Sequence, residues 1–283
     1  MSYLESNIDR VYSDALKYLE RHVTNREMQE QISELNVFLH PDRFDMKNYL
    51  ERSLIRYRAL SRLVDISDEG ECRKTSWLEV GGLYPVFPLA LAMMGLEVSV
   101  VENYSFYTDE FLSMYEDVGK NFGVKFKDAD FSSPGGACPA ELESAFDYVS
   151  CMAVVEHIPH TPRFLLGNIR RAMKSGGTFF CEVPNFYYWG NILKMLRGQH
   201  MQQPIEAVYH SGVPFVGHHR EYTLDDLLYV LRESGFRERE IVRFNYSIAL
   251  PLNLRGYLLY LPLFLFDRFK EILLVKCGLN DSG

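Results

Sequence analysis

The chain has 283 residues, of which 47% are hydrophobic and 24% charged, a composition that gives an ordinary globular protein a sizeable core. Its formal net charge of -8 argues against nucleic acid as a partner, because that binding depends on cationic contacts to phosphates. The 5 cysteines form no C-x-x-C pair, which disfavours a disulfide framework or a structural zinc site and favours a reducing, cytoplasmic compartment.

Neither an export signal nor a membrane span is expected. Residues 1–14 contain acids and lack the basic-then-apolar order of a signal peptide. The apolar run Tyr257–Phe266 is about half as long as a bilayer requires and contains Pro262. We expect this run to be buried, and a transient contact with a lipid carrier is the alternative.

The N-terminal part of the chain has a helical pattern. Residues 3 to 39 place apolar side chains at helical spacing, and the pattern continues after Pro41, from Tyr49 to Val64. The polar stretch 66–75 contains Gly70 and marks a boundary. The sequence therefore predicts a helical extension over residues 1–70 and a second domain over residues 71–283.

From Ser76 onward the sequence pattern changes and predicts strands that alternate with helices. Short runs rich in β-branched and aromatic residues predict strands at 77–80, 97–102, 124–130, 146–154 and 178–183, with final strands at 241–247 and 271–277. Strands that alternate with helices indicate βαβ crossovers and a parallel sheet.

Helix boundaries are legible in the second half of the chain. Thr161-Pro162 predicts an N-cap and a first-turn proline, and the run from Lys174 to Gly177 predicts the end of that helix. Thr223 predicts the cap of another helix, which Gly235 closes. Two insertions are expected, a lid at about 186–222 and a hydrophobic segment at about 249–269.

A candidate ligand site follows the first predicted strand. Gly81 and Gly82 stand at its carboxyl end, where glycines let the backbone approach a ligand closely. Glu102 ends the next strand about 20 residues further on, where an acid can accept both hydroxyls of a ribose. This spacing indicates a ligand with an unphosphorylated ribose, a group that adenosyl and nicotinamide-dinucleotide ligands share.

In this order the pieces resemble the seven-strand (class I) methyltransferases that depend on S-adenosylmethionine (SAM), particularly the branch acting on small molecules, quinones and sugars. Glu79–Gly82 resembles their first motif, and Glu102 resembles their ribose-binding acid. Asp130-Phe131 is similar to the pair that meets the adenine. The loop Val155–Pro159 and the segment Arg220–Thr223 are also similar to family segments, and the whole resemblance covers roughly residues 76–240.

The resemblance implies a fold, a cofactor and its contacts. The expected fold is α/β, a Rossmann-like parallel sheet with a final antiparallel strand, plus the N-terminal helices and the lid. SAM is the expected methyl donor and S-adenosylhomocysteine (SAH) the product. The expected cofactor-binding residues are Glu79, Gly81, Gly82, Tyr84, Glu102, Asn103, Tyr104, Asp130, Phe131 and Met152.

The first motif departs from the family pattern at two positions. Leu83 and Pro85 occupy places where the family usually has glycines. Leu83 adds bulk where the methionine part of SAM passes, and Pro85 removes a backbone donor. This departure motivates the alternative that the chain is a non-catalytic binding or assembly protein with a methyltransferase fold.

Candidate residues for chemistry lie after the fourth and fifth strands. A hydroxyl acceptor needs a general base, and histidine titrates in the useful range, so we predict His157, His218 and His219, with ordinary structural roles as the alternative. Aromatic and amide side chains suit a sugar, and lid packing is their alternative role. The predicted acceptor-binding residues are Asn185, Tyr187, Tyr188, Trp189 and Tyr222.

The leading hypothesis is O-methylation of a small molecule or glycan, with the N-terminal helices and the lid covering the acceptor. A metal-independent reaction is expected, because the acids and histidines show no ligand-like spacing such as H-E-x-x-H. A homo-oligomer is compatible with the sequence. A methyltransferase acting on protein or nucleic acid is a third hypothesis, which the acidic charge balance disfavours for nucleic acid.

Overall fold

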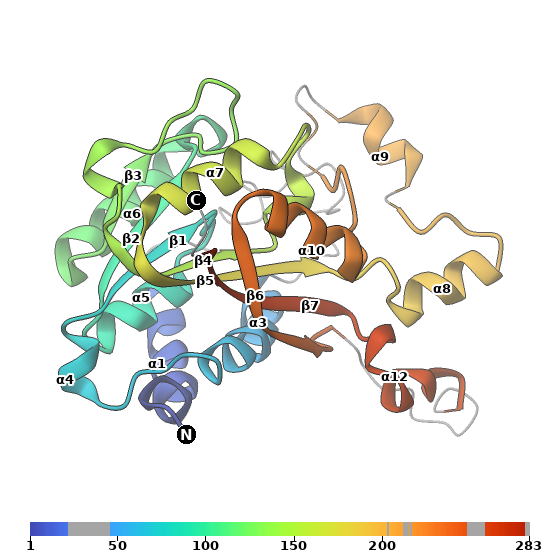
Figure 1. Cartoon of the computed structure of the whole chain (residues 1–283), viewed down its shortest axis with the longest axis horizontal. Helices are drawn as coiled ribbons and strands as arrows, with labels where there is room; N and C mark the ends of the chain where they lie inside the picture. The colour runs from blue at the N-terminus through green and yellow to red at the C-terminus, as the bar shows by residue number, and fades with distance from the viewer. Residues whose placement is uncertain (22–45, 203, 212–214, 216, 248–257, 281–283) are drawn as a thin grey trace.

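A seven-stranded sheet forms the centre of the protein (Figure 1). The structure is a computed structural model that describes residues 1–21, 46–202, 204–211, 215, 217–247 and 258–280. The sheet has the strand order β3-β2-β1-β4-β5-β7-β6. Its strands are β1 Ser76–Val80, β2 Glu97–Glu102, β3 Lys125–Asp128, β4 Phe146–Met152, β5 Met173–Pro184, β6 Phe236–Phe244 and β7 Ile272–Leu279.

The pairing directions confirm the expected α/β sheet. Strands β1 to β5 pair with one another in parallel, and β7 runs antiparallel to both β5 and β6. All residues of β1 are buried, as a parallel strand covered on both faces requires. This two-sided burial explains why β1 was recognisable in the sequence as a largely apolar run.

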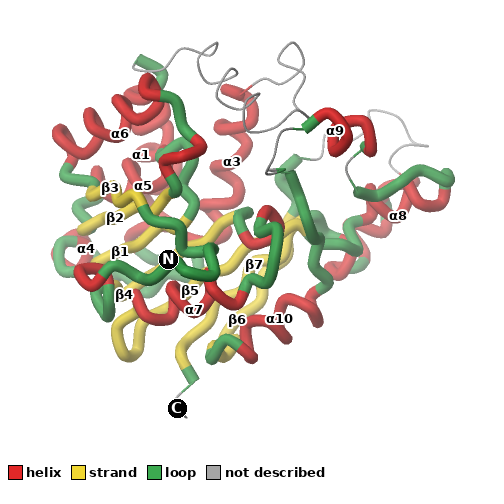
Figure 2. Tube along the Cα trace, turned by 90° about the horizontal axis from the view of Figure 1, so that it is seen from above, coloured by secondary structure: helices red, strands yellow, loops and turns green. Residues whose placement is uncertain are grey.

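Helices cover both faces of the sheet, and Figure 2 shows the two layers. On one face α1, α3, α5 and α6 share a hydrophobic core with β1 and β2, and α7 and α10 pack on the other face. The bounds of these six helices are α1 Tyr3–Leu19, α3 Met46–Ser61, α5 Val86–Met93, α6 Asp109–Phe122, α7 Arg163–Ala172 and α10 Leu224–Glu233.

Shorter helices complete the described part of the chain. Helices α8, α9 and α12 lie at one side of the molecule, beyond the ends of β5 and β7 (Figure 1). No described helix is long and apolar enough to cross a membrane. The short helices are α4 Glu69–Cys72, α8 Trp189–Leu196, α9 Ile205–His210, α12 Pro262–Leu265, η1 Tyr104–Phe106, η2 Ala140–Leu142, η3 Val155–His157 and η4 Asp267–Phe269.

The N-terminal helices are part of the main core. Helix α1 packs against α5 and α3. The Tyr12 hydroxyl donates a hydrogen bond of 2.9 Å to the backbone oxygen of Leu50, which ties α1 to α3. The predicted helical pattern between residues 22 and 39 and the break at Pro41 lie outside the described residues. So do residues 249–257 of the predicted hydrophobic segment.

One helix boundary differs from the prediction. Helix α7 ends at Ala172, and the run from Lys174 to Gly177 continues as β5 instead of closing the helix. The backbone oxygens of Arg171 and Ala172 accept hydrogen bonds from the amides of Ser144 and Ala145, just before β4. Contacts with the neighbouring strand therefore end the helix earlier than its own glycines would.

The cap of α7 is also displaced by one residue, since Pro162 is the N-cap and makes no side-chain cap. The prediction for α10 was correct. Thr223 accepts a hydrogen bond from the Asp226 amide, and the Asp226 side chain accepts one from the Thr223 amide. This reciprocal capping box satisfies two of the backbone donors that a helix start leaves unpaired.

Candidate active site

A cavity of about 670 Å³ lies at the carboxyl ends of the parallel strands. The turns that follow β1, β2, β3 and β4 form one part of its wall, and side chains of α1 and α3 form another. The position is the crevice where open α/β sheets bind ligands. Its size falls within the roughly 300–1,000 Å³ of small-molecule sites.

The turn after β1 brings the predicted glycines to the cavity wall. Gly81 has a φ of +79°, and a Cβ built on it would lie 2.3 Å from Cγ2 of Val154. Leu83 follows with a φ of 30°, and its backbone oxygen accepts a hydrogen bond from the Tyr115 hydroxyl. The close approach of two loops, from β1 and from β4, therefore requires glycine at position 81.

Pro85 is accommodated without loss of a helical hydrogen bond. It is the N-cap of α5, whose first helical residue is Val86. The first amides of a helix have no intrahelical partner, so a missing N–H costs little at this position. The amide of Leu89 donates to the Pro85 oxygen and begins the helix.

Glu102 lies beside this turn at the end of β2. The Leu83 amide donates a hydrogen bond of 2.6 Å to its Oε1, and Tyr107 also hydrogen-bonds its carboxylate. Burial raises the pKa of Glu102 to about 7, although these donors counteract the rise. Glu102, Gly81 and Gly82 all line the cavity, so the structure brings the predicted turn and acid together.

The turn after β3 adds a second acidic group to the wall. Oδ1 of Asp130 accepts hydrogen bonds from the Ser132 amide, the Ser132 hydroxyl and the Ser133 amide, which close a tight turn. The amide group of Asn103 approaches Oδ2 at 3.5 Å. Asn103, Asp130 and Phe131 line the cavity, as do Met152 and Tyr84.

Two of the predicted cofactor residues lie elsewhere. Tyr104 is not among the residues that line the cavity, and its amide donates to Asp128. Glu79 is buried within β1, where it accepts a hydrogen bond from the Ser150 hydroxyl. The indole of Trp77 donates to the same hydroxyl at 2.6 Å, so Glu79 belongs to a buried polar chain.

Glu79 makes stability depend on pH. Burial raises its pKa from 4.5 to about 8, so the folded protein holds a proton that the unfolded chain releases between these values. The contribution of this bound proton to the free energy of unfolding is fully present below pH 4.5. It is lost as pH rises to about 8, at about 1 kcal/mol per pH unit.

Glu79→Gln is expected to lose less stability than the wild type between pH 4.5 and about pH 8, measured by urea unfolding. The exposed acid Glu116 offers the control variant Glu116→Gln, which should follow the wild-type curve. Parallel curves for Glu79→Gln and the wild type would contradict the assignment.

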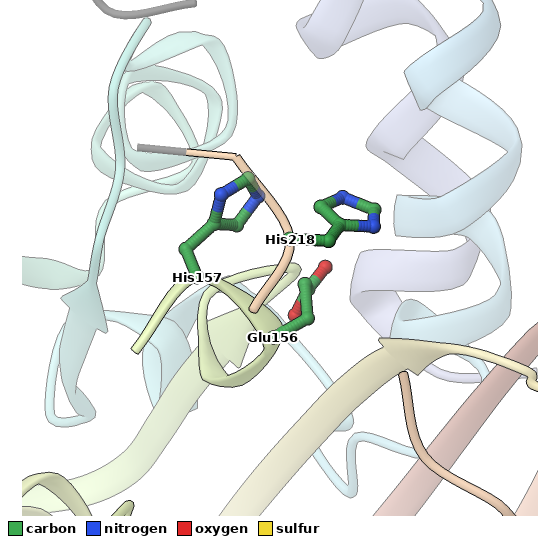
Figure 3. A group of neighbouring side chains, drawn as sticks. All are labelled: Glu156, His157 and His218. Carbon is green, nitrogen blue, oxygen red and sulfur yellow. The ribbon is translucent and has the colours of Figure 1, made fainter. Parts of the chain in front are cut away.

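The turn after β4 and the loop before α10 bring an acid and two histidines together (Figure 3). Ligand atoms of Glu156, His157 and His218 all lie within 4.8 Å of one another. The two imidazole rings are 4.7 Å apart between centroids and nearly perpendicular. All three residues line the cavity, so two of the three predicted histidines reach the site.

Neighbouring carboxylates determine the charge state of this group. Burial raises the pKa of Glu156 to about 7, and His218 counteracts the rise. Burial lowers the pKa of His218, but Glu221 and Glu156 outweigh it and leave that pKa above its ordinary value. His219 is directed away, since its Nε2 is 2.8 Å from the Phe215 backbone oxygen and the residue does not line the cavity.

The predicted acceptor residues stand behind the cavity wall or on the surface. The side-chain amide of Asn185 donates to the backbone oxygens of Arg268 and Lys270. The Trp189 indole donates to the backbone oxygen of Leu259. These contacts hold β5 against the segment before β7. Although the structure describes all five, none lines the cavity: Asn185, Tyr187, Tyr188, Trp189 and Tyr222.

The N-terminal helices instead provide the rest of the wall. Arg56 of α3 is buried, forms an ion pair of 3.0 Å with Glu182, and lies over the Tyr246 ring at 5.0 Å. The contact is an ion pair without a hydrogen bond between the two side chains. The sequence predicted that these helices cover the site but did not single out the side chains that line it. From the helices these are Tyr12, Tyr49, Leu50, Ser53, Arg56 and Tyr57, and Tyr246 joins them from the segment after β6.

Comparison with known proteins places this geometry in context. Residues 46–241 match the family described as "Methyltransferase domain", so the match begins within α3. An S-adenosylmethionine-dependent methyltransferase from Mesorhizobium loti has a TM-score of 0.51 at 17% identity, covering 78% of this chain and 96% of that chain. A proposed S-adenosylmethionine-dependent methyltransferase from Listeria monocytogenes has a TM-score of 0.51 at 12% identity, covering 80% and 98%. No curated protein matches the sequence.

Proposed function

The chain belongs to the methyltransferase-domain family, with SAM as its cofactor, and we propose that it methylates a hydroxyl group of a small molecule or glycan. One observation carries the proposal. A single cavity joins the Gly81-Gly82 turn and Glu102 to the cluster of Glu156, His157 and His218. A place for the methyl donor and a place for acceptor chemistry are thus contiguous.

The residues that line the cavity fit SAM. The Glu102 carboxylate lines the cavity at the end of β2, where an acid can accept both hydroxyls of a ribose. The apolar side chains of Phe131 and Leu165 also line the cavity and suit a purine. The cavity of about 670 Å³ is large enough for a cofactor together with part of a small acceptor.

SAM supplies a methyl group that is activated on a sulfonium, so the protein needs to position the acceptor, exclude water and accept a proton. Positioning falls to the wall provided by α1 and α3. Exclusion of water follows from the buried surroundings of Glu156 and Arg56. His157 and His218 are placed to accept the hydroxyl proton, with Glu221 beside the His218 ring.

The acceptor wall favours a small, ring-containing molecule. Tyr12, Tyr57 and Tyr246 present aromatic faces, and Tyr49 and Ser53 add hydroxyl groups. Aromatic faces combined with hydroxyls suit a sugar or an aromatic ring. Arg56 is paired with Glu182, so this wall carries no excess positive charge for a phosphate backbone.

The departures in the first motif are compatible with activity. Pro85 is the N-cap of α5, and the Leu83 amide reaches Glu102 instead of leaving the turn open. These contacts favour a cofactor site over the non-catalytic alternative. The five cysteines are buried and unpaired, which supports the expected reducing, cytoplasmic compartment.

The test uses SAM with a tritiated methyl group and the full chain. Incubation with cell extract, followed by separation of small molecules, glycans, protein and nucleic acid, is expected to show label in the first two fractions. Product analysis should find a methyl ether. His157→Ala should lower the rate by roughly 100-fold while SAH affinity is kept, because it removes the proton acceptor but no predicted cofactor contact.

Label on protein, nucleic acid or an amine would overturn the proposed acceptor. A chain that binds SAH but labels no fraction would instead support the non-catalytic alternative. A folded chain that binds neither SAM nor SAH would remove the cofactor assignment itself.

A further inference from the structure

We propose that Glu156, His157 and His218 bind one divalent transition-metal ion, such as Zn²⁺, at the acceptor end of the cavity. The group is formed by two segments, the η3 turn after β4 and the loop before α10 (Figure 3). Its ligand atoms lie within 4.8 Å of one another. This proposal replaces the expectation of a metal-independent reaction, which rested on local sequence spacing alone.

Glu156 has the surroundings of a metal ligand. Its side chain is fully buried, at 0% exposure, and no other described residue donates a hydrogen bond to either carboxylate oxygen. A buried carboxylate without partners costs several kcal/mol, so such groups are normally paired or coordinate metals. Arg56 is the nearby buried cation, and it pairs with Glu182. A cation between Glu156 and the two rings supplies the missing partner.

The ligand chemistry selects the class of ion. Two imidazoles and one carboxylate suit zinc and other divalent transition metals, whereas magnesium and calcium prefer an all-oxygen shell. Ligand bonds of about 2.1 Å place tetrahedral donor atoms about 3.4 Å apart, so small side-chain rotations complete the site. Three protein ligands leave at least one coordination position open.

Further contacts hold the ligands in place. The Glu221 carboxylate lies 3.8 Å from Nδ1 of His218, and its other oxygen accepts from the Asn191 amide at 3.2 Å. A carboxylate behind a ligating histidine fixes the ring orientation. The His219 amide donates to the Glu156 backbone oxygen at 2.7 Å, which ties the two ligand-bearing segments together.

The open coordination position faces the cavity, since all three ligands line it. There the ion would hold the acceptor hydroxyl and lower its pKa, so that the hydroxyl would release its proton to solvent instead of to His157 or His218, which are then ligands; this role rests on the proposed function. Ion binding itself does not depend on that function. It can be measured on the full chain without SAM and without an acceptor.

The experiment titrates the chelator-treated chain with Zn²⁺ and Co²⁺, following heat of binding and the visible absorption of Co²⁺. One ion per chain is expected. His218→Ala and Glu156→Gln should weaken binding by more than roughly 100-fold, and Glu221→Gln by the roughly 10- to 100-fold that is typical of outer-shell partners. His210→Ala removes an exposed histidine outside the cavity and is expected to bind like the wild type.

Stoichiometric binding that survives both His218→Ala and Glu156→Gln, or a wild-type chain that binds no ion, would overturn the proposal. Thermal unfolding checks that each variant folds. If Glu156→Gln does not fold, His218→Ala still tests the proposal, because His218 is only half-buried. SAH affinity is measured in parallel. A ligand variant that loses the ion but still binds SAH supports the metal site. A wild-type chain that binds the ion but does not bind SAH counts against the proposed function and leaves the metal site intact.

Discussion

Glu102→Ala is expected to weaken SAH binding by roughly 100-fold or more. The carboxylate faces the cavity from the end of β2, where a ribose would place two hydroxyls. Each hydrogen bond to a charged group contributes about 1.5–3 kcal/mol, so the loss of both removes most of the affinity of a nucleoside ligand. Isothermal titration of the full chain with SAH and SAM measures the change.

The control separates the site from the fold. Asp128 ends β3 and is the register partner of Glu102, but it is exposed and does not line the cavity. Asp128→Asn should therefore bind SAH normally. Glu102→Gln keeps the shape of the side chain and an acceptor oxygen, so its affinity should lie between wild type and Glu102→Ala. Unchanged SAH affinity in folded Glu102→Ala would refute the assignment of the ribose site.

Gly81→Ala is expected to destabilise the protein by roughly 3–5 kcal/mol and to abolish detectable SAH binding. Two costs add at this position. A left-handed backbone disfavours any Cβ, and here the Cβ would lie 2.3 Å from Val154 Cγ2. Relief of that clash requires the β1 and β4 turns to separate, and both turns line the cavity.

Gly123 makes the two costs separable. It has a φ of +73° at the end of α6, and a Cβ there would meet no atom within 4 Å. Gly123→Ala should therefore cost only about 1–2 kcal/mol, from the backbone alone. Urea unfolding of both variants measures the difference, and Val154→Ala combined with Gly81→Ala should recover part of it. Equal losses for the two glycines would show that the Val154 contact is irrelevant.

Much of the sheet was predictable because its signals are local. The predicted bounds of β2 agree with the structure, since a buried strand between a glycine and an acid is complete within its own run of residues. The capping box of α10 is likewise a contact between residues three apart. The end of α7 was misplaced because distant residues before β4 took up its last backbone oxygens.

The proposed cofactor-binding half of the site was also predictable from local signals. Gly81, Glu102 and Asp130 all follow the ends of strands, and parallel strands bring their carboxyl ends to one edge. Spacing along the chain therefore predicted which residues meet. Glu79 was the exception. The alternation of side chains along β1 directs the Glu79 side chain into the core. There it accepts a hydrogen bond from Ser150, whose hydroxyl in turn accepts one from Trp77.

The sequence by itself determined the fold class, the family resemblance and the glycine–acid pair, because each is encoded by periodicity or by residues at successive strand ends. Only the tertiary structure decided the side of the cavity that we propose for the acceptor, where Arg56 of α3 and Tyr246 after β6 meet. It also joined Glu156 to His218, which stand in separate segments. Packing of helices and loops across the sheet edge creates these contacts, and no local pattern encodes which distant side chains it brings together.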